Sequence, residues 1–520
     1  MSISGNWSGA MSRRRFLGLG GAGAVALAFG DVASLSPGAT GAARFRSYPF
    51  SLGVASGDPA PGGVVLWTRL APDPLDGGGM PPRAVLVRWE VSEDDRWTKI
   101  VAHGKQLARP ELGHSVHVEV DGLRPGREYF YRFKAGSELS PVGRTKTAPA
   151  ASALTPLRFA FASCQHFEHG FYTAYRHLAR EDLDVVLHLG DYIYEFGRGE
   201  YRAPSGVART YTVPEPTTLE GYRNRFAEHR SDADLRAAHA AFPWVVTWDD
   251  HEVKDNYAGD TCGTLDRAAF RRRRAAAYQA YWEHMPLRRS SMPGRGQMRL
   301  YRRLEYGRLV SFNVLDTRQY RDDQAEVGSP AWSSARRSIV GDAQERWLAE
   351  GLRRSGARWN VLAQQVFFAR RDGKPGRQER LLCDAWDGYP AARDRVTAAL
   401  SHATNPIVLS GDVHANWGND LLADYDDPDS KVIGTEFVGT SISSGGDGGD
   451  GREDADELLA ENPHIKFFNG QRGYVRCQVS EREWRTDYRV VPYVSRRGAG
   501  VSTRATFSVR AGSPGLVTGT

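Results

Sequence analysis

IVLSGDVHANW, residues 407–417, is an apolar run that stops at Gly411-Asp412 and is followed by a histidine, His414. Three other runs of β-branched and aromatic residues also stop at side chains that can bind a metal. They are VVLHLGDYIY (185–194) with Asp191, PWVVTWDDHE (243–252) with Asp249 and Asp250, and LRFAFASCQH (157–166) with Cys164. Helical patterns lie between these short runs, and such alternation predicts an α/β domain layered around a buried sheet.

Ligands gather at the carboxyl ends of strands in α/β proteins. We therefore expect the four run ends to meet at one edge, where carboxylates repel and raise one another's pKa. A bound cation removes this repulsion; the alternative is that each polar residue only caps a strand or a helix. Carboxylates suit Mg, Ca or Mn, whereas a thiolate and a phenolate with an imidazole suit iron or zinc, so two or more metals of different character are expected. The predicted ligands are Cys164, Asp191, Tyr194, Asp249, Asp250, Asp412 and His414.

The region before these runs has a different pattern. Residues 45–147 alternate apolar and polar side chains in short segments separated by turn residues, which predicts an all-β sandwich of the fibronectin or immunoglobulin kind. A Pro- and Ala-rich linker, TKTAPAASALTP (145–156), ends this region. Residues 155–510 then form the predicted catalytic domain.

The N-terminus, residues 1–43, resembles a twin-arginine export signal. Arg13 and Arg14 precede Phe16 and a Gly- and Ala-rich apolar stretch that is short for a bilayer span, which needs about 20 residues. We therefore expect no membrane span, the twin-arginine translocase as a partner during export, and a secreted, cell-surface or periplasmic location. A disordered arginine-rich tail is the alternative.

The overall composition argues against some partners. The 68 basic residues are nearly balanced by 62 acidic ones and lie scattered, so no stable nucleic-acid partner is expected. One dense basic run, FRRRR (270–274), predicts a helix with a solvated basic face, or alternatively a patch that attracts anionic substrates. Four cysteines make no disulfide framework, although Cys262 and Cys383 are candidate partners. The Gly- and Asp-rich segment 441–457 favours a solvated flexible loop, and the oligomeric state stays open.

The motifs resemble those of a known family. GDxxY, DDHE and GDVH together look like the calcineurin-like metallophosphoesterases, and SCQ, LHLGDYIYE, WDDHEV, SGDVHANW and NPHIKFFNGQRGY resemble the PhoD-like branch. The resemblance covers nearly the whole chain, including the export signal and the sandwich. It implies a layered-sheet metallophosphoesterase domain after the sandwich, with Fe(III) and Ca(II) as cofactors.

The resemblance also implies roles for the predicted ligands. Cys164 would bind iron as a thiolate, together with Tyr194 as a phenolate and with His414, while Asp191 would bridge the metals. Asp250 and Asp412 stand where the wider superfamily has Asn and His, and both are hard anions of the kind that calcium prefers. Asp249 would ligate a metal or support the ligands.

Further residues are candidates for catalysis. His251 would protonate the leaving group or stabilise the transition state. Asn416 would touch a calcium or the phosphate, and Arg225 would grip the phosphate unless it is a solvent-exposed helical arginine. His166 and His169 would either reach the cleft or serve a structural role.

The expected function is hydrolysis of phosphate mono- and diesters by a metal-activated hydroxide, in an exported alkaline phosphatase with phosphodiesterase capability. A phospholipase D-type diesterase is the first alternative. It would need exposed apolar residues at the cleft mouth, which Trp386 and Tyr389 would supply if they do not simply form a lid. The second alternative is a non-catalytic ion-binding or adhesion protein built on the sandwich.

Overall fold

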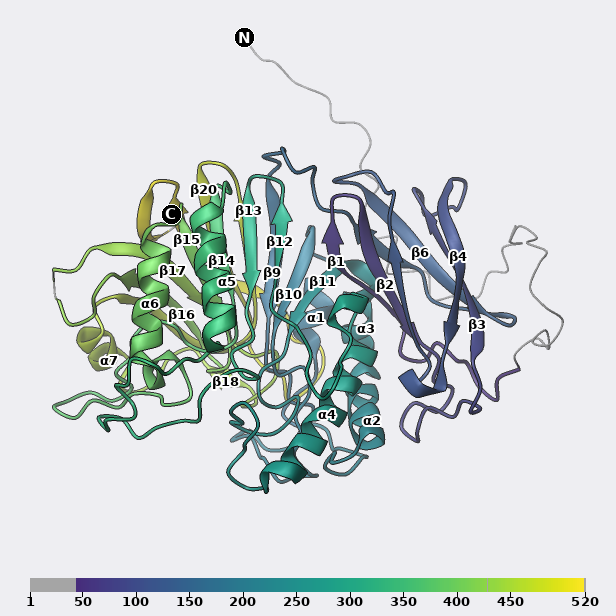
Figure 1. Ribbon diagram of the computed structural model, residues 1–520, viewed down its shortest axis with the longest axis horizontal. Coiled ribbons are helices and arrows are strands. Elements are labelled where there is room, and N and C mark those ends of the chain that lie inside the picture. Colours follow the sequence, from purple (N-terminus) through teal and green to yellow (C-terminus); the bar gives the residue numbers. More distant parts are fainter. Residues whose placement is uncertain (1–43, 428, 519–520) are drawn as a thin grey trace, which may run out of the picture.

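The computed structural model describes residues 44–427 and 429–518 (Figure 1). The predicted export signal, residues 1–43, lies outside the described residues. Within the described part of the chain, every helix is too short or too polar to cross a membrane.

Two groups of parallel strands form the centre of the molecule, within one 17-stranded sheet. The first group consists of β9 (Leu157–Ala162), β10 (Val185–Leu189) and β11 (Pro243–Thr247). The second group consists of β13 (Val310–Val314), β14 (Trp359–Ala363), β15 (Pro406–Ser410) and β17 (Val432–Val438). The long strand β19 (Ile465–Val479) pairs with β9 and with β16 (Asn416–Leu422), so it connects the two groups.

Side chains along these strands alternate between two cores, because successive Cβ atoms of a strand point to opposite faces. In β10, Leu187 packs into the core shared by the two groups, whereas Val186 packs into a core on the other face. Leu409 and Val408 alternate in the same way along β15. Both faces of each group are therefore covered, which explains why the sequence runs are continuously apolar.

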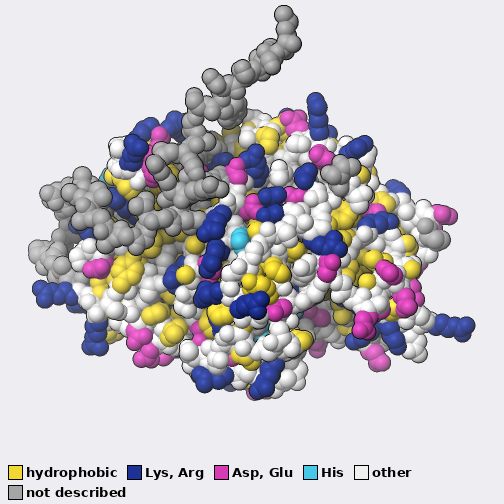
Figure 2. Space-filling model, turned by 180° about the vertical axis from the view of Figure 1, so that it is seen from behind, with side chains coloured by type: hydrophobic (Ala, Val, Ile, Leu, Met, Phe, Trp, Pro, Cys, Tyr) yellow, Lys and Arg dark blue, Asp and Glu magenta, His cyan; other side chains and the backbone are white. Residues whose placement is uncertain are grey.

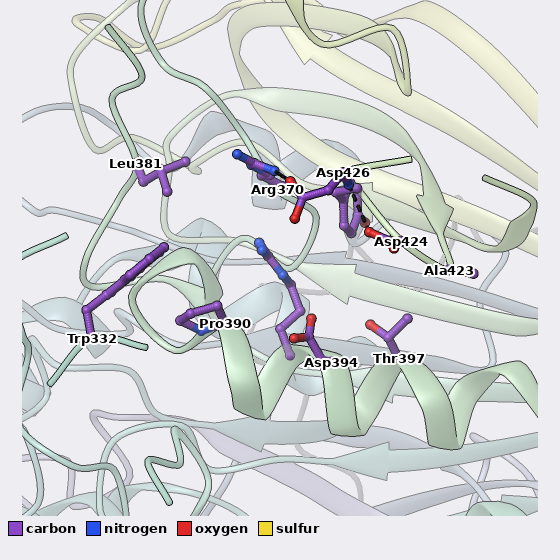
Figure 3. A pocket seen from close by; sticks show the side chains of 11 residues that line it. Trp332, Arg370, Leu381, Pro390, Asp394, Thr397, Ala423, Asp424 and Asp426 are labelled. Carbon is purple, nitrogen blue, oxygen red and sulfur yellow. Dashed lines mark hydrogen bonds and ion pairs between the residues drawn. The ribbon is translucent and has the colours of Figure 1, made fainter. Parts of the chain in front are cut away.

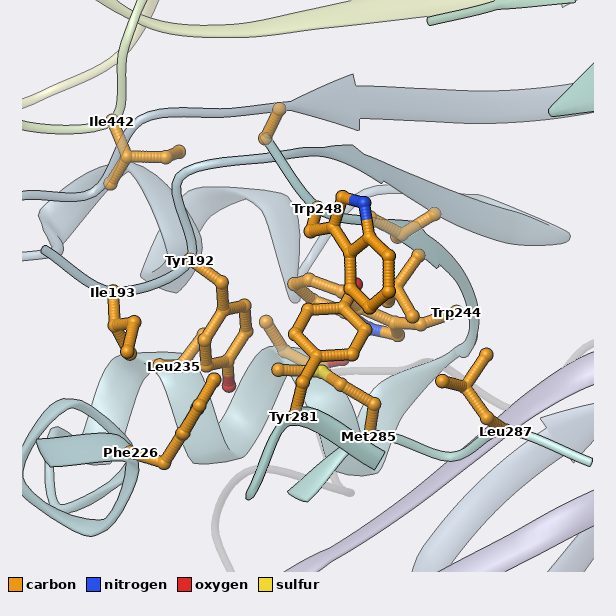
Figure 4. Packing of buried hydrophobic residues seen from close by; sticks show 14 of the residues in the cluster. Tyr192, Ile193, Phe226, Leu235, Trp244, Trp248, Tyr281, Met285, Leu287 and Ile442 are labelled. Carbon is orange, nitrogen blue, oxygen red and sulfur yellow. The ribbon is translucent and has the colours of Figure 1, made fainter. Parts of the chain in front are cut away.

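Helices cover the two outer faces (Figure 1). One outer core is rich in aromatic side chains, and Figure 4 shows Trp248 beside Tyr281 within it, at a ring-centroid distance of 5.3 Å. The helices that contribute to this core are α1 (Thr173–Leu178), α2 (Leu219–Arg230), α3 (Ala233–Ala241) and α4 (Arg267–His284). The other outer core is covered by α5 (Gly341–Arg354), α6 (Pro390–Ser401) and α7 (Ala455–Glu461).

The remaining strands and short helices complete the sheet edges and the connections. They are β12 (Arg302–Tyr306), β18 (Gly448–Gly449), β20 (Glu483–Val491), β21 (Ser502–Arg510), β22 (Ser513–Thr518), η2 (Pro110–Leu112), η3 (Arg289–Ser291) and η4 (Trp386–Gly388).

An all-β sandwich precedes this layered domain, as expected. One of its sheets contains β3 (Val85–Ser92), β4 (Ile100–Ala108), β6 (Glu128–Ala135), β7 (Glu138–Leu139) and β8 (Gly143–Lys146). The facing strands are β1 (Val54–Ala60), β2 (Gly63–Arg69) and β5 (Ser115–Val120). Strand β1 also pairs with β11 of the layered domain, so backbone hydrogen bonds join the two parts. The predicted fold class is confirmed, while the boundaries at 45–147 and 155–510 stay predictions.

Side chains from α4 and the segment after it strengthen this junction. The buried imidazole of His117, on β5, stacks on Trp282 at a centroid distance of 3.9 Å, and its Nδ1 donates to the carbonyl oxygen of Leu287 at 3.1 Å. The indole Nε1 of Trp67 donates to the carbonyl oxygen of Glu283 at 2.9 Å. Side chains of the sandwich therefore contact α4 and the segment after it directly.

Replacing His117 by Phe is expected to reduce the loss of stability in acid. Burial lowers the pKa of His117 to about 3, whereas histidine in an unfolded chain titrates at about 6.5. Between these pH values the unfolded state binds one more proton, so acidification costs the folded state about 1.4 kcal/mol per pH unit. Phe keeps a stacking ring that does not titrate. H117F should therefore lose roughly 2 kcal/mol less than the wild type between about pH 6.5 and pH 5, measured by urea unfolding.

The exposed His103 provides the control, because H103F leaves the buried imidazole in place. The explanation fails if H117F and the wild type lose stability equally over this pH range.

Candidate metal centre

The carboxyl ends of β9, β10, β11 and β15 bring the predicted ligands together. Three overlapping groups form, and within each group the ligand atoms lie within 4.8 Å of one another. The groups are Cys164 with Asp191 and His414, Asp191 with Asp250 and His251, and Asp249 with Asp250 and Asp412. Because Asp191 belongs to the first two groups and Asp250 to the last two, the potential ligands form one continuous cluster.

The first group contains a mixed set of donor atoms. The hydroxyl of Tyr194 donates to Asp191 Oδ2 at 2.9 Å and lies 3.2 Å from His414 Nε2, so the phenol joins this group. Burial, followed by the charge of Asp191, raises the pKa of the Cys164 thiol well above its ordinary value. A cation would reverse this effect, because metal coordination favours the thiolate.

The third group contains only carboxylates. Burial raises the pKa of Asp412 well above its ordinary value, and the neighbouring Asp249 adds to the shift, although Arg318 opposes it. Burial likewise raises the pKa of Asp191, with a contribution from Asp250 that His251 opposes. Buried carboxylates at such distances stay ionised only where enough positive charge is present.

Oxygen atoms of this cluster are buried without a hydrogen-bond partner. Among the described residues, Asp191 Oδ1, Asp249 Oδ2 and Asp250 Oδ1 are in this position. Buried polar atoms are normally satisfied, so these oxygens are free to bind cations. The donor set therefore fits two kinds of metal, one held by sulfur, nitrogen and oxygen and one held by oxygen alone.

The backbone is strained at these ligands. Cys164, Asp191, Asp412 and His414 have φ angles of 58°, 56°, 64° and 52°, a region that costs roughly 1–3 kcal/mol for residues other than glycine. The backbone amide of Cys164 donates to the carbonyl oxygen of Gly190 at 3.0 Å, so β9 and β10 stay in contact beyond their last paired residues. A Cβ atom at Gly190 would lie 2.5 Å from Asp249 Cβ, so only glycine allows this approach.

Arg318, which sequence reasoning missed, lies among the carboxylates. Its guanidinium is fully buried, contacts Asp249 Oδ1, and lies 2.7 Å from Asp384 Oδ2 and 3.4 Å from Asp250 Oδ1. Arg318 follows β13, whose apolar run also ends on a carboxylate, Asp316. That strand end could have marked the segment as part of the site. Asp384 lies in a connection without a periodic pattern, and we find no sequence signal for it.

His251 lies beside both the second group and Tyr194. Its Nδ1 is 2.9 Å from Glu195 Oε2, and its ring centroid is 4.2 Å from that of Tyr194. Burial alone would lower the pKa of His251, but the surrounding carboxylates, led by Asp250 and Asp191, raise it well above its ordinary value. The neighbouring carboxylates therefore favour the protonated form of its imidazole.

The contacts of Arg225 do not support the predicted grip on phosphate. The side chain is fully buried, and its Nη atoms donate to the carbonyl oxygens of Tyr194, Phe196, Val213 and Pro214. Arg225 is therefore neither solvent-exposed nor directed at the carboxylate cluster. It fixes the loop that carries Tyr194.

Asn416 also has structural partners. Its Nδ2 donates to Asn469 Oδ1 at 3.0 Å, and its Oδ1 accepts from the amide of Thr440 at 3.0 Å. These bonds connect β16 to neighbouring segments, and its predicted contact with calcium or phosphate stays a prediction.

Two other interpretations of the sequence need correction. The start of the segment 441–457 is not a solvated loop: Ser444 is buried, and its hydroxyl donates to the Tyr194 hydroxyl at 2.7 Å. Trp386 and Tyr389 are fully buried, so they do not form an exposed apolar surface.

All four cysteines, including the candidate partners Cys262 and Cys383, are free thiols.

The predicted histidines next to Cys164 belong to the support of the cluster. His166 and His169 stack at a centroid distance of 3.7 Å, and the ring of His166 lies 4.7 Å from that of Tyr194. His169 Nε2 donates to the carbonyl oxygen of Tyr201 at 3.0 Å. These contacts fit the structural role that the sequence left open for both residues.

A layered fold with clustered potential metal ligands at one edge of its strands is the arrangement expected of a metal-dependent phosphoesterase, the class that the motifs resemble. Residues 159–488 match the family described as "PhoD-like phosphatase", and residues 35–149 match "PhoD-like phosphatase, N-terminal domain". The chain belongs to the PhoD-like phosphatase family.

The chain is also similar to individual proteins that are named for this activity or share the fold. The chain is 56% identical over 517 residues to "Alkaline phosphatase D" of Bacillus subtilis (strain 168), covering 97% of this chain and 88% of the relative. A solved structure described as "Structure of PhoD" matches with a TM-score of 0.90 and 56% identity, over 92% of this chain and 94% of the other. Purple acid phosphatase PPD1 from yellow lupin shares the fold at a TM-score of 0.50 and 13% identity, over 88% of this chain and 73% of the other.

Asp412→Asn is expected to change stability in opposite directions with and without metal. In chelator at about pH 8, the amide removes repulsion from the carboxylate cluster, so the melting temperature should rise by a few degrees. With metal present, loss of an anionic ligand should weaken metal affinity by about 10–100-fold and lower the melting temperature. Thermal unfolding with and without chelator measures both effects.

The control is the exposed Asp121→Asn, which should change neither melting temperature appreciably. A D412N protein that is destabilised in chelator would show that the carboxylates do not repel one another in the metal-free state.

Proposed function

We propose that this protein is an exported alkaline phosphatase with phosphodiesterase capability. It is a phosphoric ester hydrolase of the PhoD-like family. The observation that carries the proposal is the continuous cluster in which Asp191 and Asp250 each belong to two groups of potential ligands. Carboxylates shared in this way would hold neighbouring cations, which would supply positive charge to a bound phosphoryl group.

The two kinds of donor suggest which cations bind. Fe(III) fits the group of Cys164, Asp191, Tyr194 and His414, because thiolate, phenolate and imidazole are ligands that iron accepts. Ca(II) fits the carboxylates of Asp249, Asp250 and Asp412, since calcium prefers hard oxygen ligands. When bound, the cations supply Lewis acidity and lower the pKa of a water molecule that attacks phosphorus.

The chain's own residues supply the remaining chemistry. His251 is held by Glu195 and borders the cluster, so its imidazole is placed to donate a proton to the departing alkoxide. Arg318 contacts Asp249 from within the protein and offsets part of the negative charge. Burial of these groups in the protein strengthens the electrostatic interactions among them.

Export is the proposed context for this activity. The N-terminal residues 1–43 carry the twin-arginine pattern, and the twin-arginine route accepts folded proteins with metal already bound. We place the mature protein outside the cytoplasmic membrane, as a secreted, cell-surface or periplasmic enzyme. The catalytic unit begins after the linker that ends near residue 155.

Neither alternative is favoured by a specific observation. A phospholipase D-type enzyme would need exposed apolar side chains at the cleft mouth, but Trp386 and Tyr389 are buried. A non-catalytic adhesion protein would have no use for strained ligands around a shared cluster of carboxylates.

Cys164→Ala is expected to keep the fold and to remove iron and activity. The side chain is buried beside Asp191 and His414, and a methyl group there cannot bind iron. Protein purified without chelator should contain iron at background level, and turnover should fall by about 10³-fold or more. Metal analysis and circular dichroism measure these outcomes.

Cys477→Ala is the matched control, because Cys477 is equally buried but lies in β19 away from the ligand groups. Full turnover in C164A, or equal loss in both variants, would overturn the thiolate–iron assignment.

A panel of substrates tests the proposed specificity. We expect hydrolysis of a chromogenic phosphate monoester and of a chromogenic diester, with phosphatidylcholine turned over poorly. Chelation should abolish both activities, and iron with calcium should restore them together, because one centre serves both reactions. Efficient release of choline from phosphatidylcholine would instead support the phospholipase alternative.

A further inference from the structure

A cavity of about 690 Å³ lies next to the N-terminal part of α4, and arginine is the commonest residue in its lining. Four segments contribute to it: the turn with Gly259 and Asp260, the first turns of α4, the turn around Arg295, and the segment 319–321 after Arg318. We call it the arginine pocket and define it by Arg271, Arg272, Arg274, Arg295, Arg321 and Asp260.

The arginine pocket has an excess of positive charge. Its one carboxylate, Asp260, is bound by Arg271, with Nε at 2.9 Å from Oδ2. Within the described part of the chain, Arg272 and Arg295 have no ion-pair partner. On the face drawn in Figure 2, by contrast, basic and acidic side chains are largely interspersed. An anion would balance the charge that the pocket leaves uncompensated.

A second cavity shows how different a charge-balanced pocket is. The cavity of Figure 3, about 390 Å³, contains Arg370, but that arginine pairs with Glu379 and with Asp426 at 2.5 Å each. Asp394 and Asp424 also line it. Its arginines are therefore already occupied, and the arginine pocket is the stronger candidate for an anion.

Two buried guanidinium groups of the arginine pocket each keep one nitrogen without a partner, while their other nitrogens bind Thr317 and Asp384, or Gly259 and Gly296. The side chain of Arg321 is 4% exposed, and among the described residues its Nη2 has no hydrogen-bond partner. Arg274 is 8% exposed, and among the described residues its Nε also has no hydrogen-bond partner. These two donors are themselves covered, so they add positive charge beneath the pocket, and the groups that can contact an anion are the exposed Arg272 and Arg295.

We propose that the arginine pocket binds a phosphate group, as an anion site in addition to the metal centre. Guanidinium groups present planar pairs of N–H donors that match phosphate oxygens, and such charge-assisted bonds are the strong ones. The volume lies within the range of about 300–1,000 Å³ typical of ligand pockets, so it holds phosphate together with water or with an organic group. Free inorganic phosphate and a second phosphoryl group of a substrate share this chemistry.

The arginine pocket is connected to the metal centre by a chain of ion pairs. Arg321 Nη1 lies 2.7 Å from Asp384 Oδ1, and Arg318 Nη2 lies 2.7 Å from the other oxygen of the same carboxylate. The amide of Gly259, which lines the pocket, donates to the carbonyl oxygen of Arg318 at 2.9 Å. A phosphate in the arginine pocket would therefore lie beside the segment that carries Arg318.

The test uses the metal-loaded protein and inorganic phosphate. Arg272→Ala and Arg295→Gly together remove the two unpaired charges; glycine is chosen because Arg295 has φ of 53°. Arg346→Ala with Arg353→Ala, both exposed on α5, removes the same charge elsewhere. Equilibrium dialysis with labelled phosphate should reveal two classes of site in the wild type and in the α5 control. In R272A/R295G the affinity of one class should fall by about tenfold or more.

Kinetic measurements on the same proteins distinguish the two sources of phosphate. If a substrate's second phosphoryl group is the ligand, R272A/R295G raises KM for a bisphosphate ester and leaves KM for a monophosphate ester unchanged. If inorganic phosphate is the ligand, both KM values stay unchanged while the affinity of the second class of sites falls as stated above. A binding isotherm and KM values equal to those of the α5 control would overturn the proposal. Binding is measured directly, so its failure is separate from any failure of the proposed hydrolase activity.

Discussion

Buried negative charge is the constraint on which the rest of this structure depends. Asp191, Asp249, Asp250 and Asp412 lie within two overlapping groups of ligand atoms, and burial raises the pKa of Asp191 and Asp412 well above the ordinary range. Arg318 supplies positive charge to this cluster from the protein side. The carboxylate oxygens that remain without a partner are the atoms that the proposed cations would bind, so the proposed chemistry of the centre follows from its electrostatics.

The layered sheet holds these carboxylates close together. Parallel strands covered on both faces hold their carboxyl ends at one edge, and β19 fastens the two strand groups to each other. Ligands with positive φ angles persist because the packed layers stabilise the conformation of the short connections beyond the strands. The sandwich contributes as well, since β1 extends the same sheet through its pairing with β11.

Sequence reasoning found the strand ends but not every group that acts there. Local patterns end at Cys164, Asp191, Asp249 and Asp412: an apolar run predicts a buried strand, and the polar residue that follows it predicts a potential ligand at the strand end. Arg318 escaped notice, although β13 ends in a comparable way on Asp316. Long side chains are the difficult case: whether an arginine faces solvent, backbone carbonyls or carboxylates depends on the element packed against it, as Arg225 shows.

The sequence by itself determined the alternation of strands and helices, the family, and the residue types available at the strand ends. These properties follow from local periodicity and from motifs that occupy a few adjacent residues. Only the tertiary structure decided that Cys164 and Tyr194 approach His414, that Arg318 enters the carboxylate cluster, and that several arginines face one cavity. The reason is physical: distances between remote segments are set by how the layers pack, and no local pattern encodes them.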